Sequence, residues 1–401
     1  MAVGEASTDF QVVPGVRLAS VPCGIKSQDQ LDLVLFEFQA GSTTAGVFTQ
    51  SHFAAAPVLL SREHLSRRNS RYFLINSGNA NAATGEAGKS DALACCQALS
   101  QQTGSLPDEV LPFSTGVIGE KLQVEHIANA LPELTSTLRE DNWLLAARGI
   151  MTTDTRPKIC SRQVEIEGKT VTMTGIAKGA GMIQPKMATM LAYAATDASV
   201  SQENLQAMLV DSMNQSFNRI TVDSDTSTND SCMLTATGAS GIDCNAGAAR
   251  EAFVVALNEL MRELAHAIVR DGEGATKFVA VRVEGGRTLD DCLEVAYAIA
   301  NSPLMKTALF ASDANWGRIV MAIGKANVEL DASKIDVFLD DVCLMRAGGR
   351  DDDYTEDAGA EVMKKEEITI TVNLNLGDAV ETVWTSDLSH EYVTINAEYR
   401  T

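Results

Sequence analysis

The sequence predicts an α/β protein, and three observations support that prediction. Hydrophobic residues make up 45% of the 401 residues, which is enough for a large buried core. Residues 368–376 alternate apolar and polar side chains, as a strand with one buried face does. Residues 248–269 instead repeat apolar side chains at the spacing of a long amphipathic helix. Both patterns recur along the chain, so we expect helices that pack on sheets.

The first half of the chain contains several short strand patterns. The expected elements are strands at 12–23, 31–38 and 72–75 and a helix near 90–99. The strand at 72–75 is expected to run directly into a polar loop at 76–79. Residues 163–173 predict a hairpin, because apolar residues alternate on both arms around a turn near Gly168.

The second half contains longer helical patterns. The expected elements are a buried strand at 190–195, helices at about 201–213, 248–269 and 288–300, and strands at 278–283, 368–376 and 380–385. Thr288 and Asp291 are spaced like a capping box, which favours a helix start there. The sequence has no internal repeat and no long linker rich in proline or serine.

Residues 178–191 are the segment around which the chain is organised. Glycines open the segment, Pro185 prevents a helix from running through it, and Thr189 stands directly before the buried strand. One interpretation is a glycine-rich loop that feeds a strand, with the threonine hydroxyl satisfied by a hydrogen bond. The other is a chain that cuts itself between Ala188 and Thr189. The cut would expose Thr189 as an N-terminal nucleophile, with its own α-amine as base.

Eight blocks of sequence, in order along nearly the whole chain, resemble the ornithine acetyltransferase family. The blocks are 76–81, 114–119, 151–155, 178–191, 223–230, 271–277, 312–318 and 396–401. This family makes N-acetylglutamate in arginine biosynthesis. The resemblance implies a layered α/β sandwich with an N-terminal threonine nucleophile. It also implies that autoproteolysis at Ala188–Thr189 divides the chain into an α chain (1–188) and a β chain (189–401).

The activity that the resemblance implies is acetyl transfer from N-acetylornithine to L-glutamate by a ping-pong mechanism. Thr189 would carry the acetyl group as an ester between the two half-reactions. Some family members also use acetyl-CoA as donor, and the residues leave that question open. The assembly that the resemblance implies contains two α and two β chains.

Thr115 and Gly116 follow a predicted apolar strand and offer two adjacent hydrogen-bond donors. A hydroxyl beside a backbone N–H is suited to an oxyanion hole, while the alternative is an ordinary Thr-Gly turn. The family uses this pair as its oxyanion hole. The substrate contacts that the resemblance implies are Thr152 (with Thr153 as its rival), Lys178, Thr189, Glu273, Asn396 and Thr401.

Four of these substrate contacts have a simpler interpretation. Lys178 is a plausible cation for a substrate carboxylate, and the alternative is a lysine in solvent. Glu273 could pair with a substrate ammonium, and the alternative is a charge in the loop after a helix. Asn396 and Thr401 could instead belong to a frayed tail.

Composition and charge exclude several classes of function. The formal net charge of −21 disfavours nucleic acid as a partner. No apolar run approaches the roughly 20 residues that span a bilayer, and the N-terminus lacks the pattern of a targeting peptide, so we expect a cytoplasmic protein. No cysteine pair has CxxC spacing and the histidines are scattered, so no metal or other cofactor is expected. The acidic run 351–357 predicts a solvated loop rather than a calcium site.

Two rival functions remain open at this stage. The first is a self-cleaving hydrolase such as an aminopeptidase, in which water would replace glutamate as acceptor. The second is an uncut relative that binds a ligand without catalysis, in which Thr189 would be structural.

Overall fold

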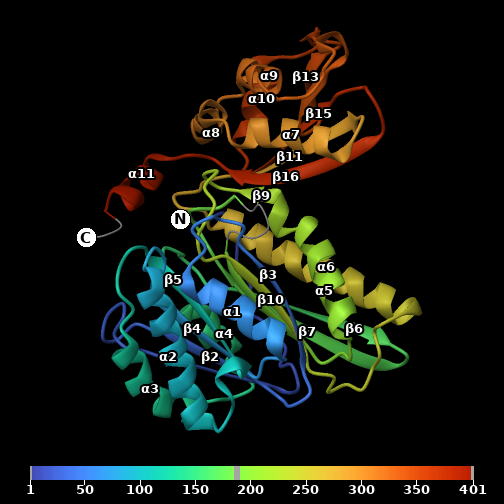
Figure 1. Ribbon diagram of the computed structural model, residues 1–401. Helices are drawn as coiled ribbons and strands as arrows, with labels where there is room; N and C mark the ends of the chain where they lie inside the picture. The colour runs from blue at the N-terminus through green and yellow to red at the C-terminus, as the bar shows by residue number, and fades with distance from the viewer. Residues whose placement is uncertain (1, 185–189, 399–401) are drawn as a thin grey trace.

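The computed structural model describes residues 2–184 and 190–398, and it confirms the predicted layered α/β fold. Figure 1 shows a larger body, coloured blue to yellow, beneath a smaller body formed by the orange and red C-terminal part of the chain. The larger body holds two sheets and the smaller body holds one.

Two sheets form the centre of the larger body. The first has the strand order β1-β2-β4-β5, with β1 at Val16–Val21, β2 at Leu33–Phe38, β4 at Tyr72–Asn79 and β5 at Val110–Val117. The second has the order β3-β10-β8-β7-β6, with β3 at Thr43–Phe48, β6 at Lys158–Ile166, β7 at Lys169–Lys178, β8 at Leu191–Thr196 and β10 at Ser231–Ala236.

Aromatic side chains from both sheets fill the space between them. Phe36 and Phe73 of the first sheet lie 5.6 and 5.8 Å from the ring of Tyr193 in the second sheet. Phe113 meets the same tyrosine edge-on at 5.1 Å. Burial of each such ring stabilises the fold by about 1.5–3 kcal/mol, and strand alternation points these rings to one face.

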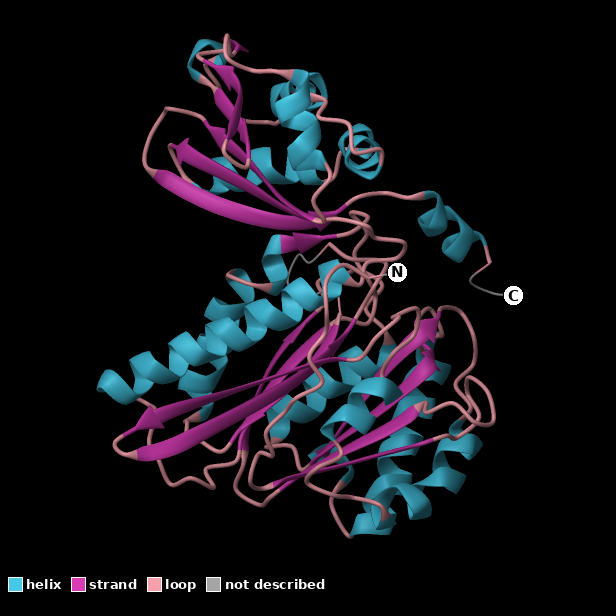
Figure 2. Ribbon diagram, turned by 180° about the vertical axis from the view of Figure 1, so that it is seen from behind, coloured by secondary structure: helices cyan, strands magenta, loops and turns pink. Residues whose placement is uncertain are grey.

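Helices cover the outer faces of both sheets. On the first sheet lie α2 (Gly85–Thr103) and α3 (Val124–Ser136), and on the second lie α5 (Gln202–Asn214) and α6 (Gly247–Arg270). The remaining helices of this body are α1 (Ala56–Arg67) and α4 (Trp143–Gly149). The larger body is therefore a four-layer helix–sheet–sheet–helix sandwich, as Figure 2 shows from behind.

The smaller body is one sheet with helices on it. Its strand order is β14-β13-β12-β15-β11-β16-β9, with β9 at Ile220–Thr221, β11 at Phe278–Gly286, β12 at Asp336–Leu339, β13 at Val342–Arg346, β14 at Gly349–Arg350, β15 at Glu367–Asn373 and β16 at Ala379–Ser386. Its helices are α7 (Leu289–Ala300), α8 (Pro303–Phe310), α9 (Trp316–Gly324) and α10 (Glu356–Met363). The last helix of the described residues is α11 (His390–Ala397). Short 3-10 turns lie at Pro107–Glu109, Phe217–Arg219 and Ala332–Lys334.

The predicted loop at 76–79 and the residues for which a Thr-Gly turn was the alternative are strands instead. Asn76 to Asn79 continue β4, and Thr115 and Gly116 lie within β5, paired with Ser77 and Gly78. The prediction of a loop was wrong because polar side chains can stay in a buried strand when they bond one another. Here Ser114 Oγ donates to Asn76 Oδ1 at 2.6 Å.

The predicted division of the chain at residues 188 and 189 falls between two neighbouring strands. β7 and β8 pair antiparallel, with Lys178 opposite Leu191, so the segments before and after residues 185–189 share one sheet. The packing units are divided elsewhere, since the core of the smaller body begins at Val279. Ala188 and Thr189 lie outside the described residues, and the division remains a prediction about the chain.

A buried ion cluster joins three segments at one end of the second sheet. Lys158 Nζ lies 2.5 Å from Asp154 Oδ1 and 2.6 Å from Asp271 Oδ2, and these three side chains are at most 1% exposed. Asp154 also accepts hydrogen bonds from the backbone N–H groups of Thr152 (2.9 Å) and Gly179 (2.8 Å). The cluster therefore ties the loop after α4, the end of β7 and the end of α6 to each other.

The charges of the cluster depend on each other. Burial alone raises the pKa of Asp154, but the charges of Lys158 and Lys178 and the Gly179 hydrogen bond outweigh burial, so that its pKa lies well below the usual value. A carboxyl group with a lowered pKa in the folded state stabilises the fold above the unfolded pKa of about 3.9. That stabilisation is lost as the pH falls below this value.

We expect Lys158→Met to lower the free energy of unfolding by about 3–5 kcal/mol, because it leaves two buried carboxylates without their cation. Lys169→Met is the matched control, since it makes the same change of charge at an exposed position of β7 and should shift stability by no more than about 0.5 kcal/mol. Urea unfolding at neutral pH measures both variants. Equal stability of the two would contradict the role of the cluster.

Candidate active site

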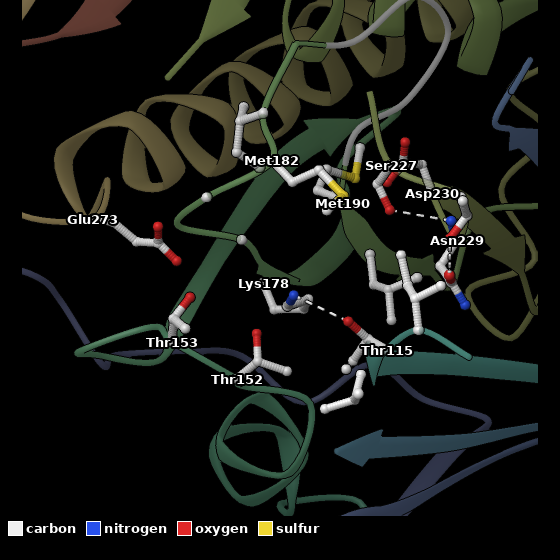
Figure 3. Close-up of a pocket in the computed structure, with 18 of the residues that line it drawn as sticks. Thr115, Thr152, Thr153, Lys178, Met182, Met190, Ser227, Asn229, Asp230 and Glu273 are labelled. Carbon is white, nitrogen blue, oxygen red and sulfur yellow. Dashed lines mark hydrogen bonds between the residues drawn. The ribbon is translucent and has the colours of Figure 1, made fainter. Parts of the chain in front are cut away.

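A cavity of about 300 Å³ lies where β5, β7 and the loops joined by the ion cluster meet. The predicted site residues that line it are Thr115, Gly116, Thr152 with its rival Thr153, Lys178, Glu273 and Asn396. Figure 3 shows Lys178 near the centre of this cavity, with Glu273 on one side and Thr115 on the other. Thr189, Ala188 and Thr401 lie outside the described residues.

Gly116 occupies a place that only glycine fits. Its φ is +136°, and an added Cβ would lie 2.2 Å from the carbonyl carbon of Gly78 on β4. The close approach of the two backbones brings the end of β5 into the wall of the cavity. A side chain at this position would therefore force apart two paired strands.

Two hydrogen-bonding side chains, Lys178 at the end of β7 and Thr115 near the end of β5, lie next to each other in the cavity. Lys178 Nζ donates to Thr115 Oγ1 at 3.1 Å. Because a hydroxyl oxygen that accepts a hydrogen bond keeps its own O–H, Thr115 can still donate toward the cavity. Burial lowers the pKa of Lys178, and the nearby Asp154 opposes that shift.

Glu273 lies on the opposite side of the cavity, directly after α6. Its backbone N–H donates to Ala180 O at 2.9 Å, and its carboxylate accepts from Asn396 Nδ2 at 2.6 Å. An added Cβ on Gly181 would lie 2.4 Å from Glu273 Oε2, so the carboxylate packs directly on that glycine. The segment that contains Gly179 and Gly181 therefore lies against the Glu273 side chain, at a distance that leaves no room for a side chain at position 181.

Thr152 and Thr153 both line the cavity, so the sequence-based choice between them stays open. The backbone N–H of Thr152 is bound to Asp154, while Figure 3 shows both threonine side chains at the lower edge of the cavity, between Glu273 and Lys178. Either hydroxyl can serve as a neutral hydrogen-bonding group beside the two charges.

Sequence reasoning missed the wall formed by Ser227, Thr228, Asn229 and Asp230. Asn229 Nδ2 donates to Ala80 O at 2.6 Å and to Ser114 O at 2.9 Å, which ties the two sheets together beside the cavity. Burial raises the pKa of Asp230 well above its usual value, against the opposing effects of Ser227 and Lys178. The segment 223–230 was noted only for its family resemblance, and its polar residues before a strand were the available signal.

Both ends of the segment 185–189 lead to this cavity. Met182 and Ile183 line it from the N-terminal side, and Met190, which follows Thr189 in the sequence, lines it from the C-terminal side. Within the described ranges, no group of three or more histidine, cysteine, aspartate or glutamate side chains could hold a metal ion.

The arrangement places charges of opposite sign on facing sides of a small cavity. The cation of Lys178 suits a carboxylate, the carboxylate of Glu273 suits an ammonium, and the Thr115 hydroxyl can donate to a carbonyl oxygen. A small zwitterion with an acyl group matches this set of partners.

The sequence pattern of the ArgJ family matches residues 17–401. The chain is 56% identical to the arginine biosynthesis bifunctional protein ArgJ of Pseudomonas syringae pv. tomato, over the whole of both chains. It is 51% identical to the protein of that name from Methylococcus capsulatus, over 98% of each.

Among solved structures, the ArgJ protein of Bacillus halodurans is 36% identical, with 51% of this chain and 96% of that chain covered and a TM-score of 0.49. The ornithine acetyltransferase of Mycobacterium tuberculosis, solved in complex with ornithine, is 32% identical, with 43% and 93% covered and a TM-score of 0.39. The match over residues 17–401 and the identity over full-length relatives agree with the order of the sequence blocks. The chain therefore belongs to the ArgJ family, a family of bifunctional arginine-biosynthesis enzymes.

Proposed function

We propose that the protein transfers the acetyl group of N2-acetyl-L-ornithine to L-glutamate through an acetyl ester on Thr189. One observation carries this proposal: the hydrogen bond from Lys178 to Thr115 lies in a cavity that Met190 also lines, with Glu273 facing them. Family membership supports the same reaction.

The proposal begins with a cut between Ala188 and Thr189. Thr189 Oγ attacks the carbonyl carbon of Ala188, the peptide nitrogen becomes the α-amine of Thr189, and water hydrolyses the resulting ester. A donor near the cavity stabilises the oxyanion that forms, and the Thr115 hydroxyl is suited to that task because Lys178 already occupies its acceptor side. The product is a free N-terminal threonine, whose amine has a reference pKa of about 7.7–8.0 and can act as a base.

Acetyl transfer then uses the same groups twice. Thr189 Oγ attacks the acetyl carbonyl of the donor, its α-amine accepts the hydroxyl proton, and ornithine leaves when its nitrogen receives a proton. The α-amine of glutamate next attacks the acetyl ester, Thr189 Oγ is released, and N-acetylglutamate departs. Thr115 and Gly116 stabilise the oxyanion in both halves, while Lys178 binds a carboxylate and Glu273 an ammonium.

Further parts of the proposal concern donors, assembly and compartment. As the second activity of a bifunctional protein, we propose acetyl transfer from acetyl-CoA to glutamate. We propose an assembly of two α and two β chains in the cytoplasm, with Thr152, Asn396 and Thr401 as further substrate contacts. Within the described residues, no helix has the length and the apolar character needed to cross a membrane.

Denaturing intact mass tests the cut. We expect the wild-type protein to give two masses that correspond to residues 1–188 and 189–401 and that sum to the uncut chain plus one water. Thr189→Ala should stay as one chain and should not turn over, because the nucleophilic hydroxyl is missing. Thr170→Ala, at an exposed threonine of β7, is the control and should be cut like the wild type. An uncut wild type, or a cut Thr189→Ala variant, would refute the proposed nucleophile.

The acceptor distinguishes the transferase from the rival hydrolase. Supplied with N-acetylornithine alone, the cut protein should release at most one ornithine per active site, because the acetyl group stays on Thr189 until an amine attacks it. Addition of glutamate should start steady turnover and form N-acetylglutamate. Steady release of free acetate that does not depend on glutamate would identify a hydrolase instead.

Thr115→Val removes the hydroxyl but keeps the shape of the side chain. We expect kcat of the fully cut protein to fall by about 10²–10³-fold, the usual effect of the loss of one oxyanion donor. Thr115→Ser keeps the hydroxyl and should retain most of the activity. Equal kcat values for the two variants would mean that groups other than the Thr115 hydroxyl stabilise the oxyanion.

A further inference from the structure

Asp223 holds one wall of the cavity through two backbone hydrogen bonds. Its carboxylate accepts from Met182 N–H at 2.6 Å and from Ile183 N–H at 2.8 Å, with a different oxygen for each. Both of these residues line the cavity, whereas Asp223 lies behind them. A single carboxylate thus fixes the direction of two successive peptide units.

The backbone on both sides of this contact has an unfavourable conformation. Met182 has φ +57° and Ser224, directly after Asp223, has φ +69°. This left-handed region is disfavoured for residues with a Cβ, and it persists only where neighbouring groups hold it. The charge-assisted hydrogen bonds of Asp223 supply such a restraint for Met182.

Asp223 also holds the C-terminal helix. Tyr392 Oη of α11 donates to Asp223 Oδ2 at 3.2 Å. Burial, together with the charge of Asp223, raises the pKa of Tyr392, so the hydroxyl keeps the proton that it donates. Figures 1 and 2 show that α11 stands at the end of an extended segment, apart from the sheet of the smaller body.

No residue of α11 belongs to the buried core of the protein, so packing of apolar side chains contributes little to its placement. One turn beyond Tyr392, Asn396 Nδ2 donates to Glu273 at 2.6 Å and so reaches the cavity. Contacts to Asp223 and Glu273 thus help to locate the helix that carries Asn396. The ring of His390 also meets Phe310 edge-on at 5.6 Å, and the backbone of Gly274 packs closely on Tyr392.

We propose that Asp223 is a positioning residue that couples the Met182–Ile183 wall to α11 and so sets the geometry of the Glu273–Asn396 pair. The role in substrate binding rests on the proposed function, whereas the coupling itself does not. Asp223 acts through Met182, Ile183 and Tyr392.

The surrounding backbone allows this coupling to be tested without loss of the fold. Val222 N–H donates to Ile183 O at 2.7 Å, and Gln184 N–H donates to Asp225 O at 2.9 Å. These bonds do not involve the Asp223 side chain. A variant of the Asp223 side chain therefore keeps these backbone bonds between residues 183–184 and 222–225. It weakens the hydrogen bonds that the Met182 and Ile183 amides donate to the side chain.

The experiment compares three variants of the full chain. Asp223→Asn weakens the bonds from the Met182 and Ile183 amides and from Tyr392, as well as the longer bond from the Asp225 N–H at 3.3 Å, whereas Tyr392→Phe removes only the bond to α11. Asp225→Asn is the matched control, since it makes the same change of charge at an exposed residue of the same loop. Hydrogen exchange followed by mass spectrometry reports the amides of residues 390–398. Steady-state kinetics report KM for N-acetylornithine and kcat.

We expect faster exchange in residues 390–398 for Asp223→Asn and Tyr392→Phe, and wild-type exchange for Asp225→Asn. KM should rise by about tenfold or more in Asp223→Asn and by less in Tyr392→Phe, because hydrogen bonds to charged groups are among the stronger ones. The kcat of Tyr392→Phe should stay near the wild-type value.

The outcomes separate this proposal from the proposed function. Wild-type exchange in α11 for both Asp223→Asn and Tyr392→Phe would overturn the coupling, whatever the kinetics. Faster exchange with unchanged KM would overturn the effect on substrate binding. If the wild type does not turn over N-acetylornithine but the exchange difference is present, the coupling stands and the proposed function fails.

Discussion

A buried lysine determines where the walls of the cavity lie. Lys158 neutralises Asp154 and Asp271, and these carboxylates in turn hold the N–H groups of Thr152, Gly179 and Thr155. Three lining residues lie within two sequence positions of a residue that the cluster holds: Thr152 near Asp154, Lys178 beside Gly179, and Glu273 near Asp271. Because a buried charge needs its partner, the three segments that contain them cannot move independently. The ion cluster therefore helps to fix the shape of the cavity, although its three side chains do not line the cavity.

The charges around the cavity differ from the charge of the chain as a whole. With a net charge of −21 the protein as a whole repels carboxylates, so recognition has to be local. Lys178 lies near Asp154 and donates to Thr115, and Glu273 faces it from the other side of the cavity. Under the proposed function, this local pair of charges, rather than the field of the whole protein, would select an amino-acid zwitterion.

Much of the fold was predictable because its signals are local. Alternation at 368–376 became β15, the hairpin at 163–173 became β6 and β7, and the helix at 248–269 became α6. The lining residues Thr115 and Lys178 were found through the family resemblance. Lys158 and Asp271, in contrast, are separated by 113 residues, and nothing in their sequence neighbourhood marks them as partners. Asp223 lies in the block 223–230 that resembles the family, but its contact with Tyr392, 169 residues away, had no signal in the sequence.

The pairing of β7 with β8 would affect unfolding and refolding of the protein after a cut. These strands flank residues 185–189 and lie inside one sheet, covered by α6 and facing the aromatic core. After a cut at the proposed place, the two pieces would stay associated through this sheet, and the native state would be almost unchanged. The unfolded state would change greatly, because two separate chains must then meet before they can refold. A protein cut in this way would fold as one chain and then remain as two associated chains. Its stability would therefore depend on the rate of unfolding rather than on its ability to refold.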